Sequence, residues 1–269
     1  MKTKPLDFSE CIRVIANVHH LDTNRYSVEL KFRDVRGNWS NVLLPRNIIR
    51  SGISALDELL DRGAQLPTAP GAGAELAGLL SVVPDRTYQI TDKTGWHDKS
   101  FVLPDVTIGP EADTLIHASR KSSKPFELPT QGNLQRWLDG LREPCCASSY
   151  LTFGIGLAFA GPLLRLVRQP EGAIFYLAGT SSRGKTLTEL AGLSAIERAK
   201  GDLLLTHDAT DRSVEEDCAA HNDLLQVIDE ISRMTGSQAE SREKVRRLAH
   251  KITGGGGSRR SAKARQVAT

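Results

Sequence analysis

The chain has 269 residues, of which 39% are hydrophobic and 25% charged, and its formal net charge is +3. This is an ordinary soluble composition, and the length is enough for two domains with a sizeable core. The charge is uneven, because residues 241–269 carry nine basic residues and one acidic residue. The protein is therefore not basic as a whole, and only its C-terminal segment is.

Export and membrane insertion are not expected from this sequence. The N-terminal residues lack the apolar core of a signal peptide. The longest apolar stretch, Leu151–Val167, contains Pro162 and Arg165 and is expected to be too short and too interrupted to span a membrane. The four cysteines have no metal-ligand spacing. These features predict a cytoplasmic protein without membrane contacts.

Alternating apolar residues predict a small antiparallel sheet over residues 7–45, with turns at 22–24 and 36–38. A further strand region is expected over Thr87–Leu103, which contains several aromatic residues. Base stacking would be one role for these aromatic side chains. Core packing is favoured instead, because they are few and the region is not basic.

A helix is expected between these strand regions. The apolar residues of Arg46–Asp61 have helical spacing, and Gly63 is expected to end the helix. Leu66–Ala74 is either a loop or the entry to a helix at Glu75–Val82. Together, these elements predict an α+β N-terminal domain over residues 1–108.

The central part of the chain reads as a connection followed by helices. Gly, Pro and Ser crowd residues 109–130, which predicts a linker. A helical segment is expected over 131–171, with helices starting at Asn133 and covering Ser149–Val167. The second helix is strongly apolar and is expected to be buried against the sheet of the last domain, residues 172–269.

A phosphate-binding motif opens the last domain. Gly179–Thr186 reads Gly-Thr-Ser-Ser-Arg-Gly-Lys-Thr and fits G-x-x-x-x-G-K-[ST]. An apolar run, Ala173–Ala178, precedes it as a predicted strand, and Leu187–Ala199 follows as a predicted helix. A chance match to the motif would not be expected to lie between a strand and a helix. The predicted strand, loop and helix together therefore favour a nucleotide-binding site.

The motif has a physical reason at each position. Gly184 lets the backbone close around phosphate oxygens, and the N–H groups of the helix start point at the anion. Lys185 would reach the β- and γ-phosphates of ATP, and the Thr186 hydroxyl would bind Mg²⁺. The predicted phosphate-binding residues are Gly179, Thr180, Ser181, Ser182, Arg183, Gly184, Lys185 and Thr186.

A pair of acids follows a second apolar run. Leu224–Glu230 reads Leu-Leu-Gln-Val-Ile-Asp-Glu, typical of a buried strand that ends in carboxylates. Asp229 is the predicted Mg²⁺ ligand, and Glu230 is the predicted general base for the attacking water. The alternative is a strand that ends in a solvated acidic turn.

The order of elements predicts the fold class. The expected elements are strand 173–178, helix 187–199, strand 202–206, helix 213–221, strand 224–229, helix 241–252 and strand 266–269. This alternation predicts an α/β fold of the RecA/AAA+-like P-loop type, with a parallel sheet and flanking helices. The sequence stops at the fourth strand, so the ATPase core is expected to be truncated there.

The chain resembles the domain of unknown function 927 family, P-loop proteins of bacteria, phages and mobile elements that are often described as helicase-like. The resemblance is carried by Gly95-Trp96, Phe101–Pro104, Gly132 with Trp137, Phe159–Leu164, Gly179–Thr186, Ala209-Thr210 and Asn222–Glu230. It implies an ATP-driven motor domain with Mg²⁺, a homo-oligomeric ring in the full-length protein, and single-stranded or forked DNA as partner. Some relatives look like MCM-type helicases of mobile elements.

Two other functions remain open at this point. One is a nucleotide-binding regulatory module that does not hydrolyse ATP. The other is a small-molecule phosphotransferase, which is less favoured because only about 40 residues separate the two motifs, little more than crossover connections need.

The basic C-terminal segment is the predicted nucleic-acid contact. In ring helicases that resemble this chain, a hairpin at this position enters the pore. Gly254–Gly257 would supply the turn, and the expected phosphate contacts are Arg259, Arg260, Lys263 and Arg265. A disordered basic tail is the alternative, because four successive glycines favour disorder.

Overall fold

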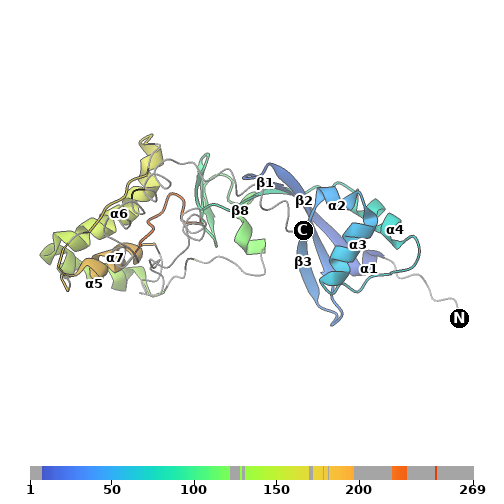
Figure 1. Ribbon diagram of the computed structural model, residues 1–269, viewed down its shortest axis with the longest axis horizontal. Helices are drawn as coiled ribbons and strands as arrows, with labels where there is room; N and C mark the ends of the chain where they lie inside the picture. Colours follow the sequence, from blue (N-terminus) through green and yellow to red (C-terminus); the bar gives the residue numbers. More distant parts are fainter. Residues whose placement is uncertain are drawn as a thin grey trace. The chain divides into compact units, whose positions relative to one another are not determined.

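The fold comes from a computed structural model, drawn in Figure 1. The structure describes residues 8–121, 128, 131–169, 172–177, 179–180, 182–196, 220–228 and 246. The chain forms two compact units. The first comprises Met1–Asp92 and Val102–Phe126, and the second comprises Lys93–Phe101 and Glu127–Thr269. The chain therefore leaves the first unit for nine residues and then returns to it.

The first unit is built on a five-stranded mixed sheet in the order β3-β2-β1-β4-β8. Strands β1, β2 and β3 pair antiparallel, whereas β4 pairs parallel with β1 and β8 parallel with β4. The antiparallel part confirms the sheet expected from the alternating sequence. The strands are β1 Ile12–His20, β2 Arg25–Arg33, β3 Trp39–Pro45, β4 Thr87–Thr91 and β8 Leu115–His117.

One feature of β1 does not follow from alternation. Its register with β2 shifts between Val14 and Ala16, which marks a β-bulge. Ile12 belongs to the main core beneath the helices, whereas Ala16 and Val18 pack in a separate cluster with Tyr88. The bulge therefore turns the apolar side of β1 from one face of the sheet to the other.

The helices of this unit lie along the sheet formed by β1, β2 and β3 (Figure 1). Their bounds are α1 Phe8–Cys11, α2 Arg46–Ile49, α3 Gly52–Asp61 and α4 Ala72–Leu80. The single helix expected over Arg46–Asp61 is thus two helices. Ser51 separates them, because its extended backbone caps α3 and its hydroxyl accepts a hydrogen bond from the Ser54 N–H.

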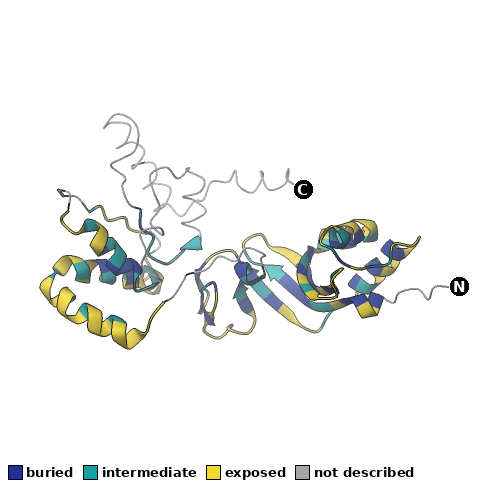
Figure 2. Ribbon diagram, turned by 90° about the horizontal axis from the view of Figure 1, so that it is seen from below, coloured by how far each residue is buried: buried dark blue, intermediate teal, exposed yellow. Residues whose placement is uncertain are grey.

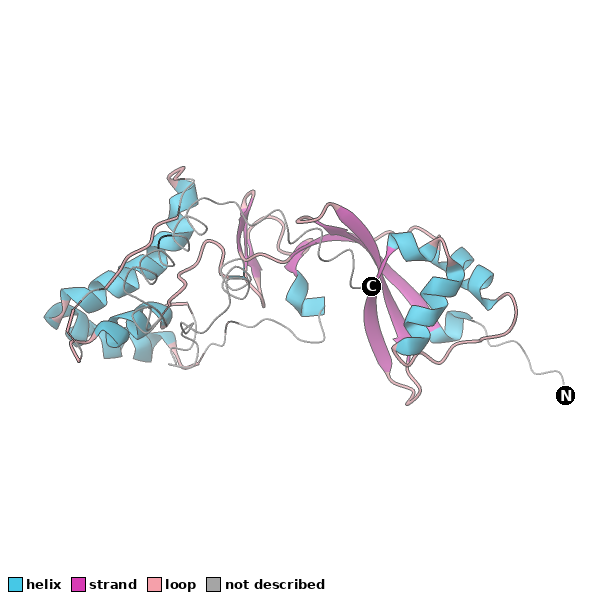
Figure 3. Ribbon diagram, viewed as in Figure 1, coloured by secondary structure: helices cyan, strands magenta, loops and turns pink. Residues whose placement is uncertain are grey.

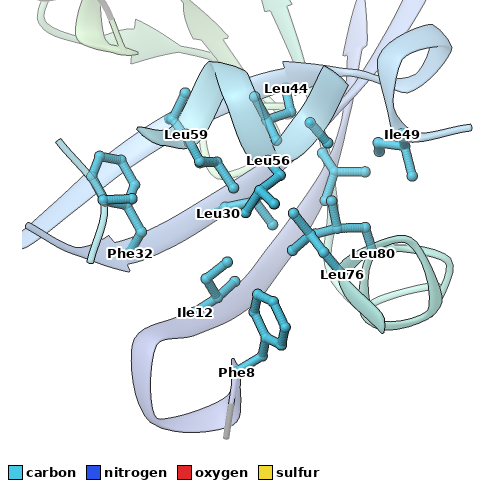
Figure 4. Close-up of a cluster of buried hydrophobic side chains, with 14 of the residues drawn as sticks. Phe8, Ile12, Leu30, Phe32, Leu44, Ile49, Leu56, Leu59, Leu76 and Leu80 are labelled. Atoms are coloured by element: carbon cyan, nitrogen blue, oxygen red, sulfur yellow. The ribbon is translucent and has the colours of Figure 1, made fainter. Parts of the chain in front are cut away.

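The main core joins these helices to the sheet, as Figure 4 shows. Leu30 and Leu44 from the strands meet Leu59 and Leu76 from α3 and α4, and all four side chains are fully buried. Helices α3 and α4 also approach each other closely. A Cβ atom at Gly52 would overlap the Gly73 carbonyl oxygen, so only glycine fits at the start of α3.

A buried ion pair lies on the opposite face of the sheet. Glu29 is 3% exposed, accepts a 2.9 Å hydrogen bond from the Tyr88 hydroxyl and pairs with Lys121 Nζ at 2.6 Å. Burial, followed by the charge of Glu29, raises the pKa of Tyr88 far above its ordinary value. Lys121 ends the 3₁₀ helix η1, Ala118–Lys121. Strand β8 and η1 therefore lie inside residues 109–130, the stretch whose composition suggested a linker.

The second unit is mainly helical where the structure describes it. Its helices are α5 Leu134–Ala147, α6 Ser149–Leu166 and α7 Lys185–Leu193 (Figure 3). Strands β5 Gly95–His97 and β6 Ser100–Val102 belong to a three-stranded sheet with β7 Thr107–Ile108. Asn133 caps α5, because its side-chain oxygen accepts hydrogen bonds from the N–H groups of Gln135 and Arg136.

Helix α6 is more exposed than its sequence suggests. Only Gly154 and Ala158 are buried, and large apolar side chains such as Phe159 and Leu163 remain exposed. Figure 2 shows how much of the helical part of this unit is intermediate or exposed. Among the described residues, α6 is the one helix long and apolar enough to cross a membrane, by length and composition alone. Two expectations are thereby corrected: the stretch is not too short or too interrupted, because Pro162 and the glycines do not break the helix, and it is not a buried core helix.

The contact between α3 and α4 gives a stability prediction. We expect Gly52→Ala to lower the free energy of unfolding of the first unit by about 1–3 kcal/mol, because the added methyl group has no space beside Gly73. Gly78→Ala is the matched control, because nothing lies within 4 Å of its Cβ position on the same helix pair. This control should be neutral or stabilising.

Urea unfolding of both variants, followed by circular dichroism, checks the prediction. Equal stability of Gly52→Ala and Gly78→Ala would contradict the close helix contact.

Candidate nucleotide-binding site

The phosphate-binding motif forms a loop that ends at the start of α7. Ser182 and Gly184 have φ angles of 59° and 84°, so the backbone turns twice through the left-handed region. Helix α7 begins at Lys185, directly after Gly184, and no side chain caps its N-terminus. Nothing lies within 4 Å of a Cβ position at Gly184. The open space and the uncapped helix start are suited to an anion.

The lysine of the motif reaches back over the loop. Lys185 Nζ donates to the carbonyl oxygens of Gly179 and Thr180, at 3.0 and 2.9 Å. Thr186, the next residue, is exposed at the helix start. The loop thus places an ammonium group and a hydroxyl group next to the open N-terminus of α7, the groups that a nucleoside triphosphate with Mg²⁺ requires.

Helix α7 is held against α6 by contacts that only small residues permit. A Cβ atom at Gly154 would overlap the Thr188 carbonyl oxygen, and one at Gly192 would lie 2.8 Å from the Gly154 carbonyl oxygen. Thr188 is also tied to the loop, because its hydroxyl donates to the Gly184 carbonyl oxygen at 3.1 Å. The other end of α7 is held by α5, where Trp137 Nε1 donates to Ser194 Oγ at 2.9 Å.

The segment that leads to the predicted acids packs on the same helix. Leu225 and Val227 form an apolar cluster with Leu190 and Leu193 of α7. A Cβ atom at Gly192 would lie 2.8 Å from Leu225 Cδ2. Ile228 is the last described residue before the predicted acids. The structure therefore brings the predicted phosphate loop and the segment with Leu225 and Val227 to one helix.

The remaining predicted site residues lie outside the described part of the chain. These are Ser181 of the phosphate loop, Asp229, Glu230, and the basic residues Arg259, Arg260, Lys263 and Arg265. The strands expected at 202–206 and 266–269 and the helix expected at 241–252, apart from Arg246, also lie outside it.

Two expected strands are not formed where the structure describes them. Residues 172–177 and 224–227 belong to no strand, and Ile228 makes only an isolated bridge. An apolar run becomes a strand only when a partner satisfies its backbone hydrogen bonds, and no described residue does so here. Phe175 instead packs edge-on against Phe153 of α6. The helix expected over Leu187–Ala199 also differs, because α7 ends at Leu193.

A junction around Gly95 and Trp96 was not predicted as part of the site. The Trp96 N–H donates to the Asp223 carboxylate at 2.9 Å, and its indole N–H donates to the Pro162 carbonyl oxygen at 2.8 Å. Arg165 in turn donates to the Trp96 carbonyl oxygen at 2.5 Å. This Gly95–Trp96 junction therefore joins α6 to the segment before Asp229. The Gly95-Trp96 pair contributes to the family resemblance, but nothing in the sequence pairs it with Asp223.

Asp223 fits this junction closely. It has a φ angle of 59°, and a Cβ atom at Gly95 would overlap its carboxylate. Asn222 adds two contacts to the same strand end, because its side-chain amide donates to the Thr94 carbonyl oxygen at 3.1 Å and its own carbonyl accepts from the Thr94 hydroxyl at 2.8 Å. The segment leading to Asp229 is thereby anchored six residues upstream of that carboxylate.

A second cluster of polar residues lies at the carboxyl ends of the parallel strands in the first unit. The Asp22 carboxylate accepts from the Thr91 hydroxyl at 2.9 Å and from the Asp92 N–H at 2.7 Å. Burial lowers the pKa of both His20 and His117, so both rings are neutral at pH 7. Within the described ranges, no three His, Cys, Asp or Glu side chains are grouped so as to hold a metal ion. These contacts tie the strand ends together.

Comparison with known proteins identifies the family. The profile of the domain of unknown function 927 (DUF927) matches residues 2–269. The chain belongs to this family. No curated protein matches the chain. Among solved structures, the fold is similar to one described as "SCCmec type IV Cch - active helicase", with a TM-score of 0.59 and 16% sequence identity. The match covers 82% of this chain and 44% of the helicase, so the DUF927 chain spans less than half of that protein's length.

The contact between α6 and α7 gives a prediction for the site. Gly154→Ala should push α7 away from α6, because its methyl group would overlap the Thr188 carbonyl oxygen. We expect weaker nucleotide binding and a loss of stability of about 1–3 kcal/mol. Gly156→Ala on the same helix has nothing within 4 Å and is the matched control.

Binding of a fluorescent ATP analogue and urea unfolding measure the two effects. If Gly154→Ala and Gly156→Ala behave alike, the helix contact does not position the loop.

Proposed function

We propose that this chain is the ATP-binding and ATP-hydrolysing motor unit of a helicase-like protein. The observation that carries the proposal is the arrangement around α7. The phosphate loop ends at its first residue, and the segment leading to Asp229 and Glu230 packs against Leu190 and Leu193 on the same helix. The fold class proposed for residues 172–269 is a P-loop core of the RecA/AAA+-like type, with a parallel sheet.

The residues of the loop fit a nucleoside triphosphate with Mg²⁺. Backbone N–H groups of the loop and of the first turn of α7 would bind the β- and γ-phosphates. Lys185 would exchange its contacts with Gly179 and Thr180 for phosphate oxygens, and the exposed Thr186 hydroxyl would bind Mg²⁺. When bound, Mg²⁺ supplies charge neutralisation at the phosphates.

The two acids have different proposed roles. Asp229 would complete the Mg²⁺ site with Thr186, and Glu230 would accept a proton from the attacking water. The anchoring of Asn222 and Asp223 by Thr94 and Trp96 supports this assignment, because it fixes the chain a few residues before the acids. A rigid approach limits the positions that the carboxylates can adopt.

The partner we propose is single-stranded or forked DNA, in mobile-element or phage replication, and the proposed location is the cytoplasm. Likeness to the fold of a helicase supports a DNA partner, as does the basic segment with Arg259, Arg260, Lys263 and Arg265. Sequence-independent phosphate contacts would suit a motor that moves along a strand. The full-length protein would act as a homo-oligomeric ring.

Lys185→Ala tests nucleotide binding. We expect it to abolish ATP binding or to weaken it severely, because the ammonium group is the one proposed side-chain contact to the terminal phosphates. Lys99→Ala removes an exposed lysine of the same unit and is the matched control. Isothermal titration with ATP and Mg²⁺ measures both. Unchanged affinity in a folded Lys185→Ala protein would exclude the phosphate-loop assignment.

Substitutions of the two acids test hydrolysis. In a protein that turns over ATP, Glu230→Gln should keep ATP bound and stop turnover, because the amide cannot accept the proton of the attacking water. Asp229→Asn should instead weaken the Mg²⁺-dependent part of binding. Phosphate release and ATP affinity, each measured over a range of Mg²⁺ concentrations, separate the two roles. Full turnover in Glu230→Gln would exclude Glu230 as the base.

A further inference from the structure

The first unit carries a basic and aromatic surface that no part of the proposed function uses. It consists of Arg13, Lys31, Arg33 and Trp39, here called the Trp39 face. The strand register places them together, because Arg13 lies opposite Lys31 on β2, and Arg33 lies opposite Trp39 on β3. Directly opposed residues of paired strands project to the same face of a sheet.

This face is the one that the helices leave open. The neighbouring residues Ile12, Phe32 and Val42 alternate with the Trp39 face and are buried in the core beneath the helices. Arg13, Lys31 and Arg33 are exposed, and Trp39 keeps 39% of its surface exposed. Strand β3 is an edge strand of the sheet (Figure 3), and Trp39 is its first residue.

The basic side chains are stacked on the tryptophan. The guanidinium carbon of Arg13 lies 4.7 Å from the centroid of the Trp39 ring, and that of Arg33 lies 5.9 Å from it. Such cation–π contacts hold the guanidinium groups over an aromatic surface. They form a platform of flat cationic and aromatic groups, on which nucleic-acid bases stack.

In the part of the chain that the structure describes, no ion pair joins Arg13, Lys31 or Arg33 to an acid. Glu29 is the single acidic residue in β1, β2 and β3, and it is buried in contact with Tyr88 and Lys121. Asp34, which follows β2, is held in the next turn, where its carboxylate accepts hydrogen bonds from the backbone N–H groups of Arg36 and Asn38. The three exposed cations therefore remain available to phosphates.

We propose that the Trp39 face binds a single-stranded nucleic acid. Arg13, Lys31 and Arg33 would neutralise phosphates, and the Trp39–arginine platform would stack one unpaired base. A duplex fits less well, because its base faces are covered by stacking on both sides. This site would be separate from the basic C-terminal segment. The proposal depends on the proposed function in one respect, because a helicase-like protein would supply the single strand. Binding to it should need no ATP.

The experiment compares two charge-matched double variants of the whole chain. Lys31→Gln with Arg33→Gln removes two cations from the Trp39 face. Arg50→Gln with Arg62→Gln removes two exposed cations on the helical side of the same unit. Affinity for labelled oligothymidylate and oligouridylate is measured by fluorescence anisotropy from low to moderate salt. The first variant should lower the log–log salt slope by about 1.4, and the control should not change it.

A second pair of variants tests the stacking. Trp39→Ala should weaken binding of the unpaired strand roughly tenfold at constant salt, whereas Trp39→Phe should keep most of the affinity. Wild-type binding of duplex DNA should be weaker and should not respond to Trp39→Ala. Circular dichroism confirms the fold, and the charge variants supply the result if Trp39→Ala does not fold.

The same double variant is also tested in two other variants of the protein, which separate the Trp39 face from the basic C-terminal segment and from the ATP site. The loss caused by Lys31→Gln with Arg33→Gln should persist when Arg259, Arg260 and Lys263 are replaced by Ala. It should also persist in Lys185→Ala, so a failure of the ATP site would leave it intact. Three results would overturn the proposal: equal salt slopes for wild type and the first double variant, an equal effect of the control, or binding to phosphatidylserine vesicles in place of oligonucleotides.

Discussion

The close approach of α6 and α7 is the constraint on which the candidate site depends. At Gly154 and Gly192 the two helices approach so closely that a backbone carbonyl oxygen of one leaves no room for a Cβ atom on the other. Backbone contact fixes the separation of two helices more tightly than interlocking side chains do, since it leaves no rotamers to adjust. The phosphate loop enters α7 directly, so its position is set by this contact.

Helix α6 then acts as the common support of the second unit. One stretch of it holds α7, and its C-terminal part, with Pro162 and Arg165, holds Trp96. Trp96 in turn holds Asp223, which begins the approach to the predicted acids. The phosphate loop ends at Thr186 and the segment before the acids begins near Asp223, yet both are held through contacts with α6. This explains why an apolar helix with a largely exposed surface has glycines at the positions where it meets other elements.

The sequence predicted the elements that are determined by residues close together along the chain. The alternation in β1 and β2 and the Asn133 cap each rest on residues within a few positions of one another, and each could be read from the sequence. The break at Ser51 was missed because the apolar spacing continues across it. Strand β8 was missed because a three-residue strand inside a Pro/Ser-rich stretch leaves no periodic signal.

The parts of the site that could not be predicted depend on long-range contacts. Nothing near Asp223 in the sequence indicates that it meets Gly95, and nothing near Trp39 indicates that Arg13 lies over its ring. The apolar runs at 172–177 and 224–227 show the opposite case. Their composition favours strands, but the neighbouring strands expected at 202–206 and 266–269 lie outside the described residues.

The excursion of Lys93–Phe101 into the second unit has a consequence for how the protein is made. Trp96 and Asp223 are 127 residues apart, so the ribosome finishes β5 and β6 long before Asp223 exists. Closing so long a loop is entropically costly and slow. Strand β8, by contrast, is synthesised soon after this excursion and completes the first sheet. A nascent chain can therefore finish the first sheet before residue 223 has been made, whereas the contact of Trp96 with Asp223 forms only afterwards.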